Sequence, residues 1–332
     1  MKQRVWYFDI LNVVACICVV CLHCNGFVHS FIKDSWWWLR VLVEVVCFFA
    51  VPVFFMLSGA TLLNYRKKYT TTTFFKKRFT RTFIPFIFWS IFFYSLYISC
   101  HGTDLLSWRE VLKNICTGKI PLTNYWFFID LFLIYAFMPF LSILKQAMSM
   151  KQIMYLCLLL GLFQTVIPTV FYFTNIQVDI SFPIGGYAIY VFVGYYLSHS
   201  TIETDDLWMT LLGAIALVSL TGRYVLVYFS ESENPALFSY LGPYAIFPAI
   251  FIFLLFKRLF TINEKNHRIC TFLSSKSLGV YLIHTFLISI IGKVINREEV
   301  VFIPISIIIV YLSSVLLVYL LQKNKYLKYL VP

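Results

Sequence analysis

The sequence predicts an all-α membrane protein, a polytopic helix bundle with about ten transmembrane helices and both termini in the cytoplasm. Of its 332 residues, 60% are hydrophobic and only 13% are charged, about half the charged share of a soluble domain. Apolar runs of about 20 residues, the length that crosses a bilayer, recur from end to end. These runs do not alternate apolar with polar residues, which argues against a β-barrel. We therefore expect one membrane domain over residues 1–332.

Reading the chain for apolar runs of that length gives ten expected spans. The first follows Lys2 and Arg4 as a signal peptide would, but it is too long and lacks a cleavage site of small residues, so we expect a mature helix. The sixth is the shortest and begins with Pro183, Gly185 and Gly186. The ten spans are 7–30, 40–63, 80–100, 124–144, 152–173, 183–199, 207–228, 240–258, 272–295 and 300–321.

Lysine and arginine residues orient the bundle. One set of connecting segments holds 19 of the 27, the opposite set holds seven, and Arg223 lies within a span. The positive-inside rule therefore places both termini in the cytoplasm. One short loop with Glu203, Asp205 and Asp206 lacks lysine and arginine, but acidic residues count little in this rule. The net charge of +12 thus indicates topology in a lipid bilayer, and no nucleic-acid partner is expected.

Apart from residues near the span ends, such as the lysines and arginines counted with the connecting segments, six ionisable side chains are expected inside the membrane, where a charge costs at least about 2.5–3.5 kcal/mol and usually faces the bundle interior or a wet cavity. They are Asp9, His23, Glu44, Asp130, Arg223 and His284.

Four of these residues are expected at one depth. Helix direction and a rise of 1.5 Å per residue place His23 and Glu44 roughly 6–11 Å below the outer surface, with Asp130 and Arg223 near the same level. A histidine oriented by a carboxylate acts as a general base. We therefore predict that His23, oriented by Glu44, takes a proton from an alcohol that enters from outside. Asp9 lies about 21 Å from His23 along the same face of the first helix.

Each of these residues also has a structural interpretation. Glu44 could form an ion pair with Arg40 one turn away. Asp130 and Arg223 could serve packing or substrate binding, and for His284 the structural interpretation leads because its neighbours are plain apolar residues. No metal site is expected, because His23 points away from the direction shared by the nearby cysteines.

The basic cluster Lys77, Arg78 and Arg81 lies at the start of the third span. Arginine pairs bidentately with phosphate, so the cluster could capture a phosphorylated donor from the cytoplasm. The alternative is a topology anchor that contacts anionic lipid. Arg78 and Arg81 are three residues apart and are expected to share one helix face.

Five motifs, in order and spacing, resemble the membrane acyltransferase 3 family across nearly the whole chain. They are Phe8-Asp9-Ile10-Leu11-Asn12 through Leu22-His23; Phe54-Phe55-Met56-Leu57-Ser58-Gly59 followed by Phe75 to Arg81 and Ile84-Pro85; Tyr125-Trp126-Phe127-Phe128 leading to Pro139; Gly194-Tyr195-Tyr196-Leu197; and Ser277 to His284. The short chain most resembles the branch that O-acetylates surface polysaccharides.

The resemblance implies transfer of an acyl group, usually acetyl from acetyl-CoA, to a sugar hydroxyl of a surface or lipid-linked glycan in the bacterial inner membrane. Acetyl-CoA is a donor substrate, and no permanently bound cofactor is expected. The family histidine matches His23, and its basic residues match Arg78 and Arg81. Asp9 stands at the family's acidic position, but Asn12 stands where many members carry arginine.

From these matches and the buried polar residues we expect two further groups of contacts. Lys77, Arg78, Arg81, Asp9 and Asn12 are expected to bind the donor. Asp130, Arg223, Trp126 and His284 are expected to bind the acceptor substrate.

Two other functions remain open. A glycolipid carrier or flippase would use the same buried polar layer without making bonds. A non-catalytic accessory subunit is suggested by Asn12. No oligomeric state is predicted, and a covalent acyl-enzyme on Ser58 or His23 is left open beside direct transfer.

Overall fold

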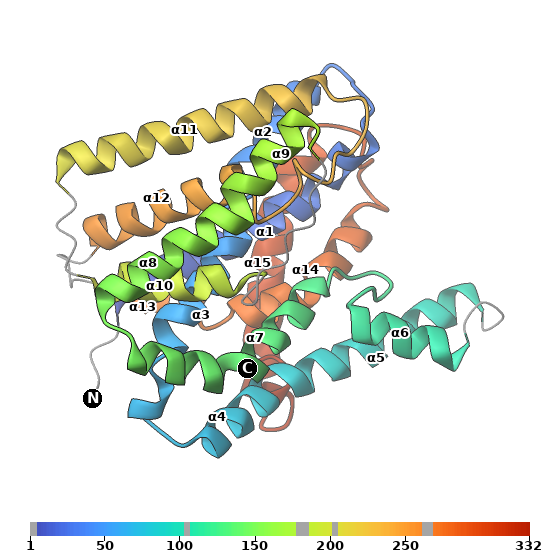
Figure 1. The fold of residues 1–332 in the computed structure, drawn as a ribbon. Helices are drawn as coiled ribbons and strands as arrows, with labels where there is room; N and C mark the ends of the chain where they lie inside the picture. Colours follow the sequence, from blue (N-terminus) through green and yellow to red (C-terminus); the bar gives the residue numbers. More distant parts are fainter. Residues whose placement is uncertain (1–4, 103–106, 177–185, 201–204, 261–267) are drawn as a thin grey trace. The chain divides into compact units, whose positions relative to one another are not determined.

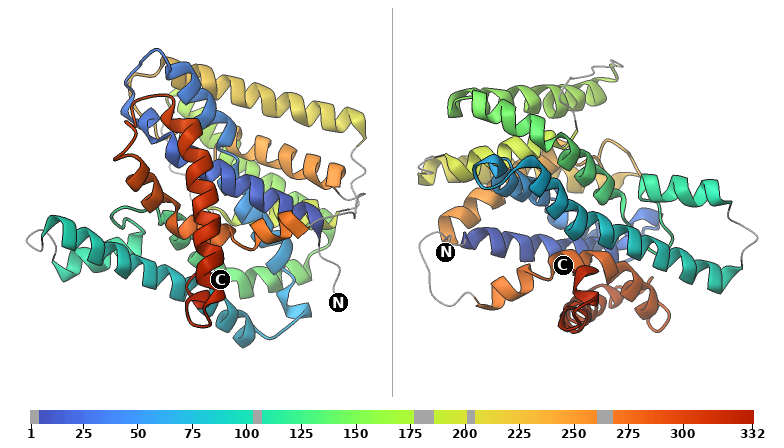
Figure 2. Two further views of the ribbon diagram at one scale, coloured as in Figure 1. Left: turned by 180° about the vertical axis from the view of Figure 1, so that it is seen from behind. Right: turned by 90° about the horizontal axis from the view of Figure 1, so that it is seen from below.

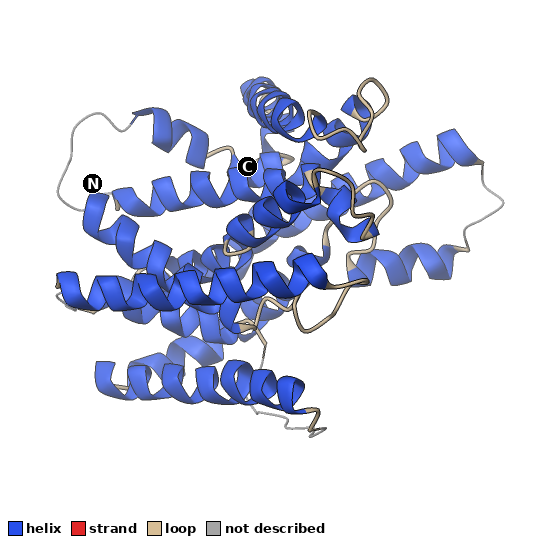
Figure 3. Cartoon of the chain, turned by 90° about the horizontal axis from the view of Figure 1, so that it is seen from above, coloured by secondary structure: helices blue, strands red, loops and turns tan. Residues whose placement is uncertain are grey.

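The computed structural model describes residues 5–102, 107–176, 186–200, 205–260 and 268–332. Helices make up nearly all regular structure in these ranges, and none of the residues described forms a strand (Figure 3). The chain divides into two compact units. Unit 1 comprises residues 1–64 and 140–271, and unit 2 comprises residues 65–139 and 272–332. The all-α prediction is therefore confirmed.

Unit 1 contains the first three helices and the middle of the chain. Figure 1 shows α8 and α9 as one continuous rod, with α11 running beside α12. Its helices are α1 (Trp6–Cys24), α2 (Trp37–Cys47), α3 (Ala50–Leu62), α8 (Met150–Gly161), α9 (Ile167–Thr174), α10 (Ala188–His199), α11 (Asp206–Phe229) and α12 (Pro243–Phe260).

Helices α3 and α10 form the closest packing in unit 1. A Cβ atom built on Gly194 would lie 2.1 Å from the Met56 carbonyl oxygen, and one built on Gly59 would lie 2.0 Å from the Val191 carbonyl oxygen. Only glycine allows two helix backbones to approach this closely, as at small-residue contacts in membrane bundles. The motifs that contain these two glycines are therefore packing elements as well as sequence signatures.

Local sequence explains where several helices of unit 1 begin. Ser149 and Gln152 form a reciprocal capping box at α8. The Asp205 side chain accepts from the Trp208 backbone N–H at 3.0 Å and begins α11. Such caps satisfy backbone N–H groups that the first helical turn leaves without partners.

Unit 2 contains the remaining helices. Figure 2 shows α14 and α15 packed together, and α6 running back beside α5. Its helices are α4 (Thr71–Arg78), α5 (Ile84–His101), α6 (Trp108–Thr117), α14 (Ser277–Ile291) and α15 (Phe302–Lys323). Two further helices, α7 (Trp126–Ala147) and α13 (Arg268–Ser274), run through the boundaries between the units.

The predicted spans agree with the structure to within a few residues at most ends. In the described residues, eight helices are long and apolar enough to cross a membrane, and α13 with α14 adds a ninth that is bent by 61°. The sixth expected span, 183–199, corresponds to α10, which has 12 residues; its expected start at 183–185 lies outside the described residues, as do Lys2, Arg4 and Glu203. The chain is a multi-pass membrane protein.

Two differences have local causes. The first span was expected to reach residue 30, but α1 ends at Cys24 because Asn25 leaves helical geometry and a 3₁₀ turn follows over Gly26–Ser30. The short helix α6 was not predicted, since its polar face hides it from a search for apolar runs. It begins at a capping box of Ser107 with Glu110 and ends at Gly118, which has a φ of 69°.

We predict that Gly194→Ala lowers the apparent melting temperature of the detergent-purified protein, because its methyl group overlaps the α3 backbone and overpacking costs about 1–3 kcal/mol. The control is Gly222→Ala on α11, where no atom lies within 4 Å of the added carbon. That control should melt with or above the wild type, since alanine is the better helix former. Equal melting of Gly194→Ala and wild type would refute the close packing.

Candidate active site

Three polar residues of α1 lie along one stripe of that helix. Because α1 is unbroken, Asp9, Asn12 and His23 fall within about 60° of one another around its axis. Asp9 is buried, whereas Asn12 and His23 are half-buried. The Thr271 hydroxyl donates to the Asp9 carboxylate at 3.5 Å. The stripe therefore runs along α1 from Asp9, near one end, to His23 at the other.

His23 occupies the last turn of α1. Asn25, two residues after His23, ends the helix. The backbone N–H of Asn25 donates to the Cys21 carbonyl at 3.0 Å. The buried Asn25 side chain donates through Nδ2 to the Arg40 carbonyl on α2 at 2.7 Å. This bond ties the end of α1 to α2.

Glu44 forms a buried ion pair with Arg223. Arg223 Nη2 donates to Glu44 Oε1 at 3.2 Å, and Nη1 donates to the Glu44 carbonyl at 3.3 Å. The two residues are 2% and 1% exposed, so neither charge is hydrated by bulk water. A buried carboxylate without its partner is strongly destabilising, and α2 and α11 are therefore joined at this point.

Aromatic rings complete the environment of Arg223. Its guanidinium lies 3.6 Å from the centroid of the Phe48 ring and 5.3 Å from that of Tyr244. Its Nε donates to the Leu237 carbonyl at 2.8 Å. Cation–π contacts strengthen when desolvated. Arg223 therefore has a structural role that joins α2 and α11 to the segment that precedes α12.

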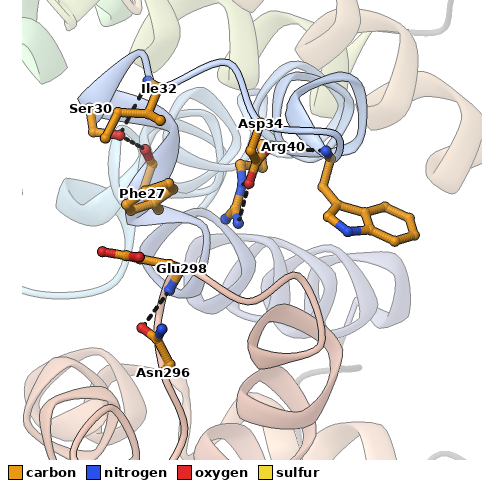
Figure 4. Close-up of polar contacts among 8 residues, drawn as sticks. Phe27, Ser30, Ile32, Asp34, Arg40, Asn296 and Glu298 are labelled. Carbon is orange, nitrogen blue, oxygen red and sulfur yellow. Dashed lines mark hydrogen bonds and ion pairs between the residues drawn. The ribbon is translucent and has the colours of Figure 1, made fainter.

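Arg40 has a different partner from the one considered in the sequence analysis. Its Nη2 lies 3.1 Å from Asp34 Oδ2, and the guanidinium lies 4.7 Å from the centroid of the Phe27 ring. Figure 4 shows Asp34 and Arg40 facing one another just before and within α2. The alternative of a Glu44–Arg40 ion pair is therefore wrong. Glu44 has a stronger partner in Arg223, 179 residues away, and sequence spacing along one helix cannot reveal it.

The second carboxylate oxygen of Glu44 does not take part in the ion pair with Arg223. Glu44 Oε2 is buried, and within the described residues it has no hydrogen-bond partner. His23 and Glu44 belong to the same unit, and their pairing as a base and its orienting group stays a prediction. Asp130 is half-buried on α7 in unit 2, so its expected place in the same layer is untested.

The basic cluster lies in unit 2 at the junction of α4 and α5. Arg78 is half-buried, with its guanidinium 5.5 Å from the centroid of the Tyr135 ring, and within the described residues its buried Nε has no hydrogen-bond partner. Lys77 is exposed and its Nζ lies 4.1 Å from the centroid of the Tyr69 ring. Arg81 is exposed. The cluster therefore combines one half-buried basic side chain, Arg78, with two exposed ones, Lys77 and Arg81.

A π-turn over Phe79–Phe83 directly follows Arg78 and contains Arg81. Pro85 explains it, because proline lacks an N–H and its ring clashes with the carbonyl four residues earlier, here that of Arg81. A wider turn relieves this conflict within a continuous helix. We expected Arg78 and Arg81 to share one face of an α-helix. The π-turn changes the helical geometry between them, so the three-residue spacing does not place them on one α-helical face.

His284 is buried on α14, and its position supports the structural interpretation. It is 1% exposed, and Nδ1 lies 2.9 Å and 3.1 Å from the carbonyls of Tyr281 and Val280 in its own helix. An imidazole nitrogen this close to carbonyl oxygens donates its proton to them. His284 as an acceptor-binding residue stays a prediction.

Two of the sequence motifs contact one another in unit 2. Tyr125 donates its hydroxyl to the Leu282 carbonyl at 2.5 Å, and Tyr281 donates to the Asn124 carbonyl at 2.8 Å. Trp126 begins α7 and is half-buried, with Asp130 one turn later. These reciprocal bonds explain why both motifs contain tyrosine, and the sequence analysis missed them because the partners are 157 residues apart.

We predict that Arg223→Ala destabilises the protein by about 3–5 kcal/mol, because the Glu44 carboxylate stays buried without its counter-charge. Arg258→Ala is the control, since Arg258 pairs with Asp206 at the surface, where the side chains are 42% and 89% exposed, and such pairs contribute about 0–1 kcal/mol. Thermal unfolding in detergent measures both.

The double variant Arg223→Met/Glu44→Met separates loss of the ion pair from loss of volume. Replacement of both charges by apolar groups is often neutral, so the double variant should recover much of the stability that Arg223→Ala loses. Equal effects of Arg223→Ala and Arg258→Ala would contradict the role assigned to the buried pair.

Comparison of the chain with known proteins identifies its family. A family described as an acyltransferase domain, acyltransferase 3, matches residues 5–321. No curated protein and no solved structure matches the chain. The match spans α1 to α15 and includes every motif noted in the sequence. The chain therefore belongs to the acyltransferase 3 family of membrane acyltransferases.

Proposed function

We propose that the protein transfers an acetyl group from cytoplasmic acetyl-CoA to a hydroxyl of a cell-surface or lipid-linked glycan, with His23 as general base. The family match supports acyl transfer. The observation that carries the proposal is the position of His23, half-buried in the last turn of α1 and on the same stripe as Asp9 and Asn12. A base must be reachable by its substrate, and this imidazole is not sealed in the core.

The proposed reaction is a direct transfer. His23 accepts the proton of the acceptor hydroxyl while that oxygen attacks the thioester carbonyl. The carbon–sulfur bond breaks as the carbon–oxygen bond forms, and the departing CoA thiolate takes the proton from the imidazolium. General-base catalysis of this kind contributes about 10²–10⁴-fold. The Ser58 hydroxyl donates to the Phe54 carbonyl of its own helix at 3.0 Å, and the proposed reaction uses no acyl-serine.

In this proposal the basic cluster binds the diphosphate of the donor. Arg78 has a buried Nε without a hydrogen-bond partner among the described residues, and Lys77 and Arg81 are exposed beside it. Arginine and lysine pair strongly with phosphate. Asp9 and Asn12, which share one stripe of α1 with His23, are proposed as further contacts of the donor.

The first test is His23→Ala. Incorporation of label from acetyl-labelled CoA into the glycan of membranes that contain the protein should fall by at least about 10²-fold, because the proton acceptor is lost. The control is His29→Ala, which removes a histidine whose side chain is 43% exposed, and it should retain activity. Both variants must reach wild-type membrane levels.

Label incorporation by His23→Ala at the wild-type rate would refute the general-base role. Unlabelled glycan that crosses sealed vesicles without ever gaining label would support the alternative of a carrier instead.

The second test concerns the donor. Arg78→Ala and Lys77→Ala should raise the KM for acetyl-CoA and leave the KM for the acceptor unchanged. The same variants should lose little activity with the acetyl thioester of N-acetylcysteamine, which has no phosphate. Lys325→Ala, a basic residue beyond the end of α15, is the charge-matched control.

If Arg78→Ala and Lys77→Ala lowered activity equally with both donors, the cluster would be an anchor and would not bind the donor.

A further inference from the structure

A pocket in unit 1, lined by apolar residues and several hydroxyl and amide groups, has no assigned role. Its walls come from α9, from the π-turn that precedes it over Leu162–Val166, and from residues 236–244 ahead of and within α12. We propose that this pocket binds one sugar ring of the acceptor, a neutral hydroxyl-rich ligand. The inference rests on the proposed function, since it names where the glycan substrate is held.

The chemistry of the walls supports a neutral polyol. Amide and hydroxyl groups are supplied by Gln164, Thr165, Thr169 and Ser239, and aromatic rings by residues that include Tyr172. Among the residues that the structure describes, no lysine, arginine, histidine, aspartate or glutamate lines it. A phosphate or carboxylate would find no counter-charge there, which excludes the diphosphate of the donor as its ligand. Hydroxyls and amides beside aromatic faces suit the alternating polar and apolar surfaces of a sugar.

The hydroxyl of Thr165, in the pocket wall, is buried without a hydrogen bond to the residues that the structure describes. Thr165 is 2% exposed, and within the described part of the chain its Oγ1 has no hydrogen-bond partner. A buried hydroxyl without a partner costs free energy that a bound donor or acceptor recovers. The unsatisfied Thr165 hydroxyl is therefore consistent with a ligand that supplies the missing hydrogen bond.

The backbone places Gln164 and Thr165 in this position for a definable reason. Pro168 lies four residues after Gln164, so an α-helix would bring the proline ring against the Gln164 carbonyl. The π-turn over Leu162–Val166 accommodates it. Turns of this kind occur frequently at functional sites. The same device precedes Pro85 beside the basic cluster of unit 2.

The opposite wall is held by the buried ion pair. Leu237 and Tyr244 line the pocket, and both contact Arg223, through the Leu237 carbonyl and the Tyr244 ring. Next to Leu237, the Phe238 ring lies 5.4 Å from that of His29, in the turn that follows α1. The wall is therefore preorganised, and it belongs to the end of unit 1 at which α1 terminates.

The size of the pocket restricts the ligand. Its cavity volume is ≈ 140 Å³, and an engineered cavity of about 150 Å³ in another protein holds a single benzene ring. Asn234 donates to the Tyr172 hydroxyl at the end of α9, beside the lining residues. The pocket is therefore too small for an oligosaccharide, and one sugar ring is the largest unit expected there.

The test uses the full-length protein with two measurements. Thermal unfolding in detergent, with a panel of methyl pyranosides as probes, reports binding without chemistry. At least one pyranoside should raise the apparent melting temperature of the wild type and of His23→Ala. Thr165→Val, which keeps the shape and removes the hydroxyl, and Ala236→Phe, which fills the pocket, should abolish that rise.

Acetyl transfer supplies the second measurement. Thr165→Val and Gln164→Leu should each raise the KM for the acceptor by about three- to tenfold, the effect of one hydrogen bond, and leave the KM for acetyl-CoA unchanged. The control is Thr174→Val, since Thr174 is exposed on the same helix, bonds to its own helix and does not line the pocket.

The two proposals fail in different ways. Pyranoside binding without any acetyl transfer would support the pocket and overturn the proposed function. Acetyl transfer that depends on His23 but ignores Thr165→Val, Gln164→Leu and Ala236→Phe would overturn the pocket alone. Native mass spectrometry that finds a phospholipid displaced by Ala236→Phe, with no pyranoside effect, would assign the pocket to lipid and overturn the inference.

Discussion

The pairing of a buried guanidinium with a buried carboxylate organises unit 1. Arg223 and Glu44 lie on helices that are far apart in sequence. Both side chains are buried, and the charge of either one would strongly destabilise the fold without the other. Because the same guanidinium also binds the Leu237 carbonyl and contacts Phe48 and Tyr244, one residue joins α2, α11 and the start of α12. The end of α1 that holds His23 is fastened to α2 by Asn25. The proposed base and the proposed sugar pocket thus share one rigid support.

Proline determines the second recurring feature. Pro85 and Pro168 each follow a π-turn inside a long apolar helix, and in each case the polar residues of interest lie in or beside that turn. A wider turn shifts side chains from the positions that an α-helix would give them. In unit 2 the result is a half-buried Arg78 and an exposed Arg81. In unit 1 the result is a buried Thr165 in the wall of a pocket.

Much of this architecture could be predicted from apolar length alone, because a bilayer demands about 20 apolar residues for each crossing. That constraint located most spans to within a few residues. It could not show that Asn25 would end α1 six residues early, or that α6 would form between two spans. Partners such as Glu44 and Arg223, or Tyr125 and Leu282, come together only through tertiary packing. Spacing along one helix suggested Arg40 as the partner of Glu44, and it was wrong for that reason.

In the proposed reaction His23 is the base that activates the glycan hydroxyl for attack on the acetyl thioester. The most direct measurement is mass spectrometry of the surface glycans of cells that lack the protein, produce the wild type, or produce His23→Ala at the same membrane level. The account predicts one acetyl increment per modified unit with the wild type alone. The same increment in cells that produce only the His23→Ala protein would contradict it.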